Sequence, residues 1–165
     1  MKAVVHILAG LGAMLVLLAL LSCTKVSQPG AVQQQEEENP EEESQMPDKI
    51  KITIDGKTLS VALVNNDATK ALVATLKEAP ITYKASDYGG FEKVGPLGRS
   101  LPTNDSRITT QAGDVILYSG NQIVLFYGSN SWSYTRIGRM EYESPDALKS
   151  FLKAGKGDIS VKLSL

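Results

Sequence analysis

Short runs in which apolar and polar residues alternate dominate the chain from residue 48 onward, and they predict β-strands. Isoleucine occupies every second position in the segment 50–54, and leucine and valine do the same in the segment 59–63. Alternation with period two buries one side of a strand and leaves the other side in water. Asp55-Gly56 separates the two runs and is a typical hairpin dipeptide. The segment therefore predicts a hairpin with one buried face.

A helix and a second hairpin are predicted further along. The helix is expected over residues 68–79, with Asp67 as its N-cap residue and Pro80 ending it. The apolar segments 115–118 and 122–127 flank a short polar turn, so they predict two antiparallel strands. The second of these strands is apolar on both faces, which indicates a central position in a sheet.

The remaining segments complete a mainly β domain. A strand is expected over residues 133–141, a helix from Ser144 to near Gly155, and a last strand over residues 159–163. Residues 86–104 are rich in glycine and proline and predict a long loop, of a length that is often functional. About seven short strands with two helices predict a β-barrel or curled sheet whose openings are capped by the helices.

The first 22 residues have the pattern of a secretory signal peptide. Residues 7–21 contain no charge, but this run is too short to span a hydrocarbon core, which needs about 20 residues. Residues 20–23, Leu-Leu-Ser-Cys, match the lipobox pattern, in which cleavage precedes a cysteine that becomes diacylated. We therefore expect a lipoprotein signal peptide over residues 1–22 and lipidation of Cys23. The alternative is a short membrane anchor with an incidental cysteine.

The chain has one cysteine and one histidine, Cys23 and His6. Cleavage before Cys23 leaves a chain without histidine, and lipidation consumes its only thiol. Catalysis by a Ser-His-Asp or Cys-His arrangement and histidine-ligated metal sites are thereby excluded from the mature chain. The glycines of the segment 86–104 form no P-loop, because no Gly-Lys-Ser/Thr string follows them, and the sequence has no Asp-x-Asp loop of the EF-hand type. We expect neither a metal nor a cofactor.

Residues 23–47 predict a disordered acidic linker. The glutamate triplets at 36–38 and 41–43 lie among prolines, and the segment has no aromatic residue, so it cannot bury enough apolar surface to offset the entropy of ordering. The alternative for the acidic run is an export or sorting signal. The domain at 48–165 has 12 acidic and 15 basic side chains, too small a positive surplus for a nucleic-acid-binding protein.

These features together predict one domain on a flexible tether, attached to a membrane of the cell envelope through Cys23. Thr24 stands where some bacteria place the aspartate that retains lipoproteins in the inner membrane. We therefore expect the outer membrane, with the domain facing the periplasm or the exterior. We also expect a monomer that binds no nucleic acid.

Three strings resemble the bacterial cyclophilin-like fold proteins. They are GGFEKVG at residues 89–95, AGDVILY at residues 112–118 and LFYGSNSWSYTRIGRM at residues 125–140. The resemblance covers about 115 residues, nearly the whole domain. It implies a closed β-barrel of about eight strands with two capping helices, in agreement with the pattern of strands and helices above.

The resemblance is weaker at the position of cyclophilin catalysis. True cyclophilins isomerise prolyl peptide bonds with an arginine, because a donor near the prolyl nitrogen favours the twisted amide. The string Gln-Ala-Gly-Asp at residues 111–114 is similar to their Gln-Gly-Gly-Asp. However, Thr103 stands where the arginine is expected, and Ile108 stands where they have phenylalanine. The resemblance therefore implies a noncatalytic domain, with a divergent isomerase as the alternative.

The candidate ligand-binding residues combine aromatic rings with polar groups. Trp132, Tyr134 and Arg136 have the i, i+2, i+4 spacing that places them on one face of a strand, where arginine binds a carboxylate while the rings stack on the ligand. They predict a small anionic or peptide ligand at the barrel mouth. The alternative is structural: Trp132 plugs the barrel end, and Arg136 pairs with a neighbouring acid. The full candidate set is Tyr88, Phe91, Arg99, Gln111, Trp132, Tyr134 and Arg136.

Three functions remain open from the sequence. The domain binds a small or peptide ligand without catalysis, acts as a prolyl isomerase or exported folding helper, or serves as a structural envelope protein. A concave pocket favours the first two, whereas a filled barrel with a flat apolar patch favours the third. Asp114 is a possible general base, but Gly-Asp before a strand more often forms a turn in which the carboxylate accepts backbone N–H groups.

Overall fold

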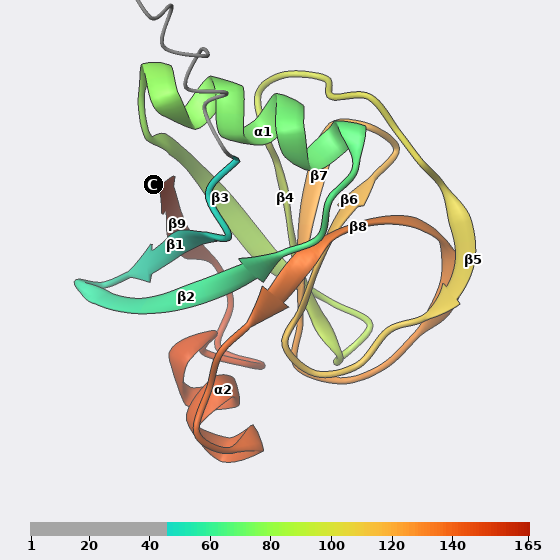
Figure 1. Ribbon diagram of the computed structural model, residues 1–165. Helices are drawn as coiled ribbons and strands as arrows, with labels where there is room; N and C mark the ends of the chain where they lie inside the picture. Colours follow the sequence, from blue (N-terminus) through green and yellow to red (C-terminus); the bar gives the residue numbers. More distant parts are fainter. Residues whose placement is uncertain (1–45) are drawn as a thin grey trace, which may run out of the picture. The chain divides into compact units, whose positions relative to one another are not determined.

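The protein is described here from a computed structural model, which describes residues 46–165 (Figure 1). The predicted signal peptide, the lipidation site Cys23 and the linker up to residue 45 lie outside the described residues. Among residues 46–165, no helix is long and apolar enough to cross a membrane.

Nine strands and two helices form this part of the chain. The strands are β1 (Lys49–Ile54), β2 (Lys57–Leu63), β3 (Ile81–Tyr88), β4 (Glu92–Pro96), β5 (Ser106–Thr109), β6 (Asp114–Tyr118), β7 (Gln122–Phe126), β8 (Ser131–Met140) and β9 (Ile159–Ser164). The helices are α1 (Asp67–Glu78) and α2 (Pro145–Phe151).

Eight of the strands close into an antiparallel barrel, which confirms the predicted fold class. Their order is β2-β1-β9-β3-β4-β7-β6-β8, and pairing of β2 with β8 closes the ring. Gly138 lies at the closure opposite Leu63, and a Cβ there would lie 2.3 Å from the carbonyl oxygen of Ala62. Only glycine permits this close approach of the two backbones. The ninth strand, β5, pairs with β8 alone and lies beside the barrel (Figure 1).

The two predicted hairpins are present. Asp55 and Gly56 adopt φ angles of 48° and 76° between β1 and β2, as a two-residue turn with both central residues in the left-handed region requires. Residues 119–121 connect β6 to β7. The strand predicted at 133–141 is β8, and the one at 159–163 is β9.

The prediction of one long loop over residues 86–104 is wrong in its first half. β3 continues to Tyr88, and β4 starts at Glu92 and pairs with both β3 and β7. Gly89 and Gly90, with φ angles of 60° and 76°, form the tight turn between the two strands. The glycine pair that indicated a loop therefore forms the turn of a hairpin. β4 was not predicted because its sequence, Glu-Lys-Val-Gly-Pro, contains two charged residues, a glycine and a proline.

The helices begin close to the predicted positions, with one correction. Ser144 caps α2 as predicted, since its hydroxyl accepts the backbone N–H of Ala147. The N-cap of α1 is Asn66 and not Asp67, because the Asn66 side chain accepts the N–H of Thr69 at 2.9 Å. Asn66 also donates from its amide nitrogen to the carbonyl oxygen of Arg136 at 2.7 Å, so the cap ties the helix to β8.

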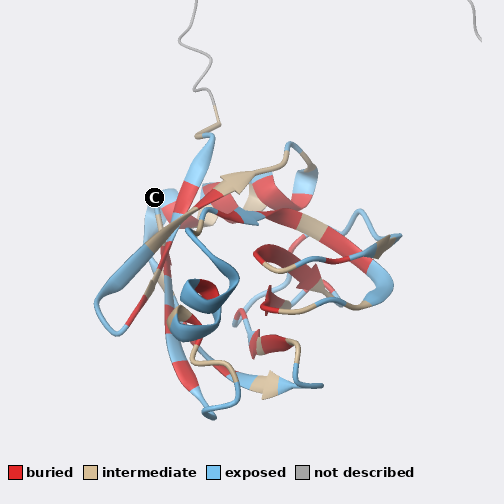
Figure 2. Ribbon diagram, turned by 90° about the horizontal axis from the view of Figure 1, so that it is seen from below, coloured by how far each residue is buried: buried red, intermediate tan, exposed pale blue. Residues whose placement is uncertain are grey.

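The main core lies inside the barrel. Along β1 and β9 buried residues alternate with less buried ones (Figure 2), and the buried set belongs to the main core cluster. Helix α1 lies across one end of the barrel and α2 across the other (Figure 1). Leu72 and Leu76 of α1 and Leu148 of α2 join the same core cluster as the strands. The helices therefore bury the ends of the barrel interior, as predicted.

Candidate functional site

The wall formed by β4, β7, β6 and β8 has a second apolar face, outside the barrel. On β7, Ile123 and Leu125 belong to the main core, whereas Val124 and Phe126 are buried in a separate cluster on the opposite face. Ile116 of β6 and Tyr134 of β8 belong to this outer cluster. Both faces of β7 are thus covered, which explains why its sequence is continuously apolar.

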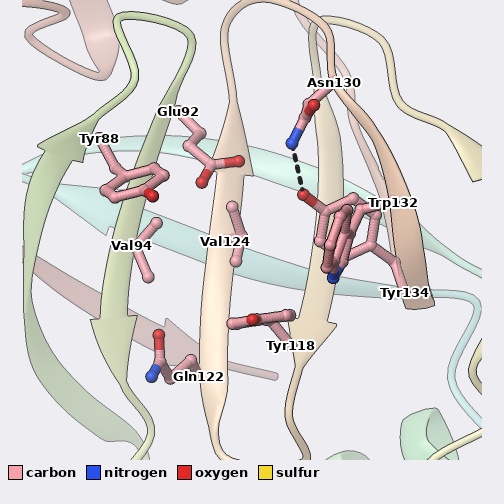
Figure 3. Close-up of a pocket in the computed structure, with 9 residues that line it drawn as sticks. All are labelled: Tyr88, Glu92, Val94, Tyr118, Gln122, Val124, Asn130, Trp132 and Tyr134. Carbon is pink, nitrogen blue, oxygen red and sulfur yellow. Dashed lines mark hydrogen bonds between the residues drawn. The ribbon is translucent and has the colours of Figure 1, made fainter.

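A pocket opens on this outer face. Its volume is about 360 Å³, and its walls come from β3, β4, β6, β7, β8 and the turn before β8. It lies against the outside of the barrel wall, not at an open end. Figure 3 shows the lining residues, which are Tyr88, Glu92, Val94, Tyr118, Gln122, Val124, Asn130, Trp132 and Tyr134.

Aromatic side chains dominate the pocket. Tyr118 and Tyr134 meet edge to face with ring centroids 6.0 Å apart, and the Tyr134 hydroxyl accepts a hydrogen bond from the Asn130 amide at 2.9 Å. Burial, and then the negative charge of nearby Glu92, raise the pKa of Tyr134. Trp132 and Tyr88 remain 54% and 65% exposed. The pocket therefore combines fixed rings on its floor with two rings that still have free faces.

Glu92 is the acidic group of the pocket. Its side chain extends from β4 toward Val124 in the middle of the pocket (Figure 3), yet the residue is only 5% exposed. Its Oε2 atom has no hydrogen-bond partner. Burial raises the pKa of Glu92 to about 7. A carboxyl group that is desolvated, unpartnered and directed into a pocket is typical of a ligand-binding or proton-transfer position.

Trp132, Tyr134 and Arg136 share the outer face, as their spacing predicted, but only the first two line the pocket. Arg136 donates to the carboxylate of Asp114 at 2.6 Å, and Asp114 is fully buried. Asp114 also accepts the backbone N–H of Gln111 at 2.9 Å. Arg136 is therefore paired with a neighbouring acid, as the structural alternative stated. The Arg136–Asp114 pair links β8 to the first residue of β6.

The other predicted candidates have separate positions. Tyr88 lines the pocket, and Phe91 packs beneath it by stacking on Phe126. Gln111 lies before the start of β6 and accepts a hydrogen bond from Arg139. Arg99 donates to the Thr75 hydroxyl of α1 at 3.2 Å. Gln111 and Arg99 are absent from the pocket lining.

The sequence-based reasoning missed several lining residues, above all Glu92. The signal was a glutamate within GGFEKVG, a string already singled out by its resemblance to a family. Once that string is read as a strand, Glu92 and Lys93 must point to opposite faces. Tyr118 and Val124 were predicted as strand residues but not as site residues, because both faces of their strands are apolar.

Lys93 is the buried counterpart of Glu92. It is fully buried, and its ammonium group lies 2.7 Å from the Asp87 carboxylate. Asp87 also accepts hydrogen bonds from the Tyr127 hydroxyl and from the backbone N–H groups of Gly155 and Gly157. Burial opposes ionisation of Asp87, but these donors, with Lys93 the strongest, lower its pKa. The Lys93–Asp87 pair is therefore a satisfied structural element.

No group of three or more histidine, cysteine, aspartate or glutamate side chains within residues 46–165 is arranged to hold a metal ion. Among the residues that line the pocket, Glu92 is the one whose side chain can carry a full charge near neutral pH.

Two solved structures share the fold of this chain. The hypothetical protein AF2241 from Archaeoglobus fulgidus, solved in solution, has a TM-score of 0.52 and 19% identity, covering 75% of this chain and 98% of its own. McbB, solved in complex with tryptophan, has a TM-score of 0.50 and 16% identity, covering 70% of this chain and 44% of its own. At these identities the likeness concerns the fold alone. No curated protein matches the sequence.

The sequence model of the cyclophilin-like family matches residues 52–164. This match begins within β1 and ends with β9, so it includes all the other strands and both helices. The closed antiparallel barrel, the family match and the two similar structures agree with one another. The chain therefore belongs to the cyclophilin-like family.

Proposed function

We propose that this protein is a lipid-anchored envelope protein whose cyclophilin-like barrel binds a small ligand in the pocket outside β4, β7, β6 and β8. The observation that supports binding most directly is the pair of exposed rings, Trp132 and Tyr88, at a concave apolar site. Large aromatic surfaces facing water at a concave site are typical of ligand-binding positions. The anchoring part of the proposal comes from the signal-peptide pattern and Cys23.

The composition of the pocket supports a ligand with a flat apolar group. A volume of about 360 Å³ lies at the lower end of the range of small-molecule sites, roughly 300–1,000 Å³. Val94 and Val124 provide apolar contacts, while Trp132 and Tyr88 offer faces on which a planar group stacks. Gln122 and Asn130 supply amide groups that could orient the ligand.

The same pocket argues against prolyl isomerisation by the cyclophilin mechanism. That mechanism needs a cationic donor beside the prolyl nitrogen. None of the described residues that line the pocket is arginine or lysine, and Arg136 on the same face is paired with Asp114. Binding without catalysis is therefore the better interpretation. The concave shape likewise favours a ligand site over the flat patch expected of a purely structural protein.

Trp132 offers a direct test of binding, because it is the only tryptophan of the chain. The full chain in phosphatidylcholine nanodiscs is titrated with phenylalanine, phenylalanine-containing dipeptides and short proline peptides while Trp132 fluorescence is recorded. Phenylalanine is included because McbB was solved with an aromatic amino acid. We expect a saturable change with at least one aromatic ligand. Exchange spectra of the proline peptides are recorded in parallel, and accelerated cis/trans exchange would support the isomerase alternative.

The Trp132→Ala variant provides the matching loss of function. We expect the affinity measured by calorimetry to fall by about tenfold or more, since a stacking ring contributes on the order of 1 kcal/mol beyond its buried area. Phe151→Ala is the control, because Phe151 lines a separate hollow near α2. Equal affinities of the wild type and Trp132→Ala for every ligand that binds would place binding elsewhere.

A further inference from the structure

The Glu92 carboxyl group lacks what a buried polar group normally has. The residue is 5% exposed, and Oε2 makes no hydrogen bond within the described part of the chain. Leaving such a group unsatisfied destabilises a folded protein, and more so if the group is charged. Protein structures retain this cost mainly where a ligand, a water or an ion completes the site.

The charges around Glu92 leave it uncompensated. Lys93, its neighbour in sequence, extends to the other face of β4 and binds Asp87 and the carbonyl oxygen of Gly157. Arg136 is bound to Asp114. The pocket lining contains no basic side chain, so its only formal charge is the negative one that Glu92 can carry.

The aromatic rings favour the same sign of ligand charge. Tyr88 lies on one side of the Glu92 carboxyl group, and Trp132 and Tyr134 lie on the other (Figure 3). The face of an aromatic ring carries negative electrostatic potential and attracts cations, with tryptophan the strongest. A carboxylate that lies between aromatic rings is therefore suited to an ammonium group and unsuited to a carboxylate ligand.

We propose that the pocket selects an organic cation, a primary or secondary ammonium group joined to a planar apolar group, whose N–H donates to Oε2 of Glu92 while its apolar part contacts Trp132. The inference rests on the proposed binding function and names the ligand class of that site. It reverses the charge expected from the sequence, because Arg136, the group expected to bind an anion, is already occupied.

The proposal also predicts how binding responds to pH. Phenols surround Glu92: Tyr88 from β3, Tyr118 from β6, Tyr127 after β7 and Tyr134 from β8. Arg136, on the same face of the sheet, is paired with Asp114. An aliphatic ammonium stays protonated through about pH 8. Since the pKa of Glu92 is about 7, cation binding strengthens as pH rises through that value.

The test compares three probes of nearly equal shape: 2-phenylethylamine, 2-phenylethanol and 3-phenylpropionate. Calorimetry with the full chain in phosphatidylcholine nanodiscs at about pH 8 gives their affinities, with empty nanodiscs as the blank. We expect the amine to bind at least tenfold tighter than the alcohol, and the carboxylate to bind weakest. In Glu92→Gln this preference for the amine should disappear, while Glu143→Gln, a matched change in the hollow near α2, should keep it.

The outcomes separate this inference from the binding function. Equal affinities for amine and alcohol, or tighter binding of the carboxylate, would overturn cation selection and leave ligand binding intact. Failure of all three probes and of the Trp132 titration would overturn both. The wild-type affinity for the amine at about pH 6 and about pH 8 needs no variant, and a pH-independent value would also contradict the role of Glu92.

Discussion

Glu92 and Lys93 are adjacent charged residues on β4, both buried, with opposite consequences. Lys93 points to the inner side, where Asp87 and the carbonyl oxygen of Gly157 satisfy it. Glu92 points outward into an aromatic pocket, where Oε2 has no partner. A buried charge that is paired has a structural role in the folded protein. A buried charge that is unpaired lowers the free energy of unfolding unless a ligand binds it.

This contrast predicts that the ionisation of Glu92 opposes folding. Burial raises the pKa of Glu92 from 4.5 to about 7, so the unfolded chain ionises this group at a lower pH than the folded protein does. The stability contributed by the protonated carboxyl group is complete below pH 4.5 and is lost as pH rises through about 7. Glu92→Gln removes this dependence.

Urea unfolding of the wild type and of Glu92→Gln at about pH 5 and about pH 8 measures the effect. We expect the wild type to lose roughly 2 to 3 kcal/mol relative to the variant between the two pH values, since one pKa unit corresponds to about 1.36 kcal/mol. Asp87, whose pKa is lowered, stays ionised throughout this range and does not contribute. Parallel changes in the two proteins would show that Glu92 ionises freely in the folded state.

Among the elements, α1 shows how one hydrogen bond decides where a helix begins. Asn66 and Asp67 are both good N-cap residues by type, and the structure uses Asn66. Asn66→Ala should lower the free energy of unfolding by about 1–2 kcal/mol, because the variant loses the bond to the N–H of Thr69 and the bond to the carbonyl oxygen of Arg136. Thermal and urea unfolding report this loss.

Asp67→Ala is the matched control for the cap. Asp67 lies in the first turn of α1, where its charge interacts favourably with the helix dipole, so we expect a loss of only about 0.5 kcal/mol. A larger loss in Asp67→Ala than in Asn66→Ala would indicate that the sequence-based choice of the cap was right.

The strands differ in how far the sequence predicted them. β1, β2 and β9 keep a strict alternation, and the turn residues Asp55-Gly56 mark the first hairpin. β4 begins with two charged residues, and β5 is mostly polar or charged, because the environment of both strands comes from partner strands distant in sequence. The sequence pattern of a strand indicates which of its two faces is apolar. It does not indicate which neighbouring strands will cover those faces.

The site shows the same division. Trp132, Tyr134 and Tyr88 could be predicted from residue type and spacing, and the pocket contains all three. For Arg136 the sequence left two alternatives open, and the role of Glu92 was not predicted, since both depend on which partner each group finds across the sheet. Asp114 neutralises the first, and nothing among residues 46–165 neutralises the second.

At the scale of the whole molecule, the proposed membrane anchoring is tested at Cys23. We expect metabolic labelling with palmitate to modify the wild-type chain and not Cys23→Ala, because the lipobox pattern predicts that the acyl chains attach at this residue. Two acyl chains hold a protein stably on a membrane at about 0.8 kcal/mol per buried CH₂ group, whereas one chain binds only reversibly.

Intact mass spectrometry provides the complementary measurement. The mature wild-type chain should begin at Cys23 with the acyl groups attached, and Cys23→Ala should retain residues 1–22. Cleavage at another position, or label that persists in Cys23→Ala, would contradict a lipoprotein. The Glu92 and Trp132 experiments do not depend on this result, because their residues belong to the barrel.

The meeting of β1 with β9 has a consequence for the order of events during biogenesis. Lys51 on β1 donates to the carbonyl oxygen of Leu165, 114 residues away, and β1 lacks one of its two neighbours until β9 is available. Pairings of such long range form late, because the intervening chain must first be ordered. If the chain is exported from its amino end, as its signal-peptide pattern predicts, the barrel therefore cannot close before the last strand has crossed the membrane.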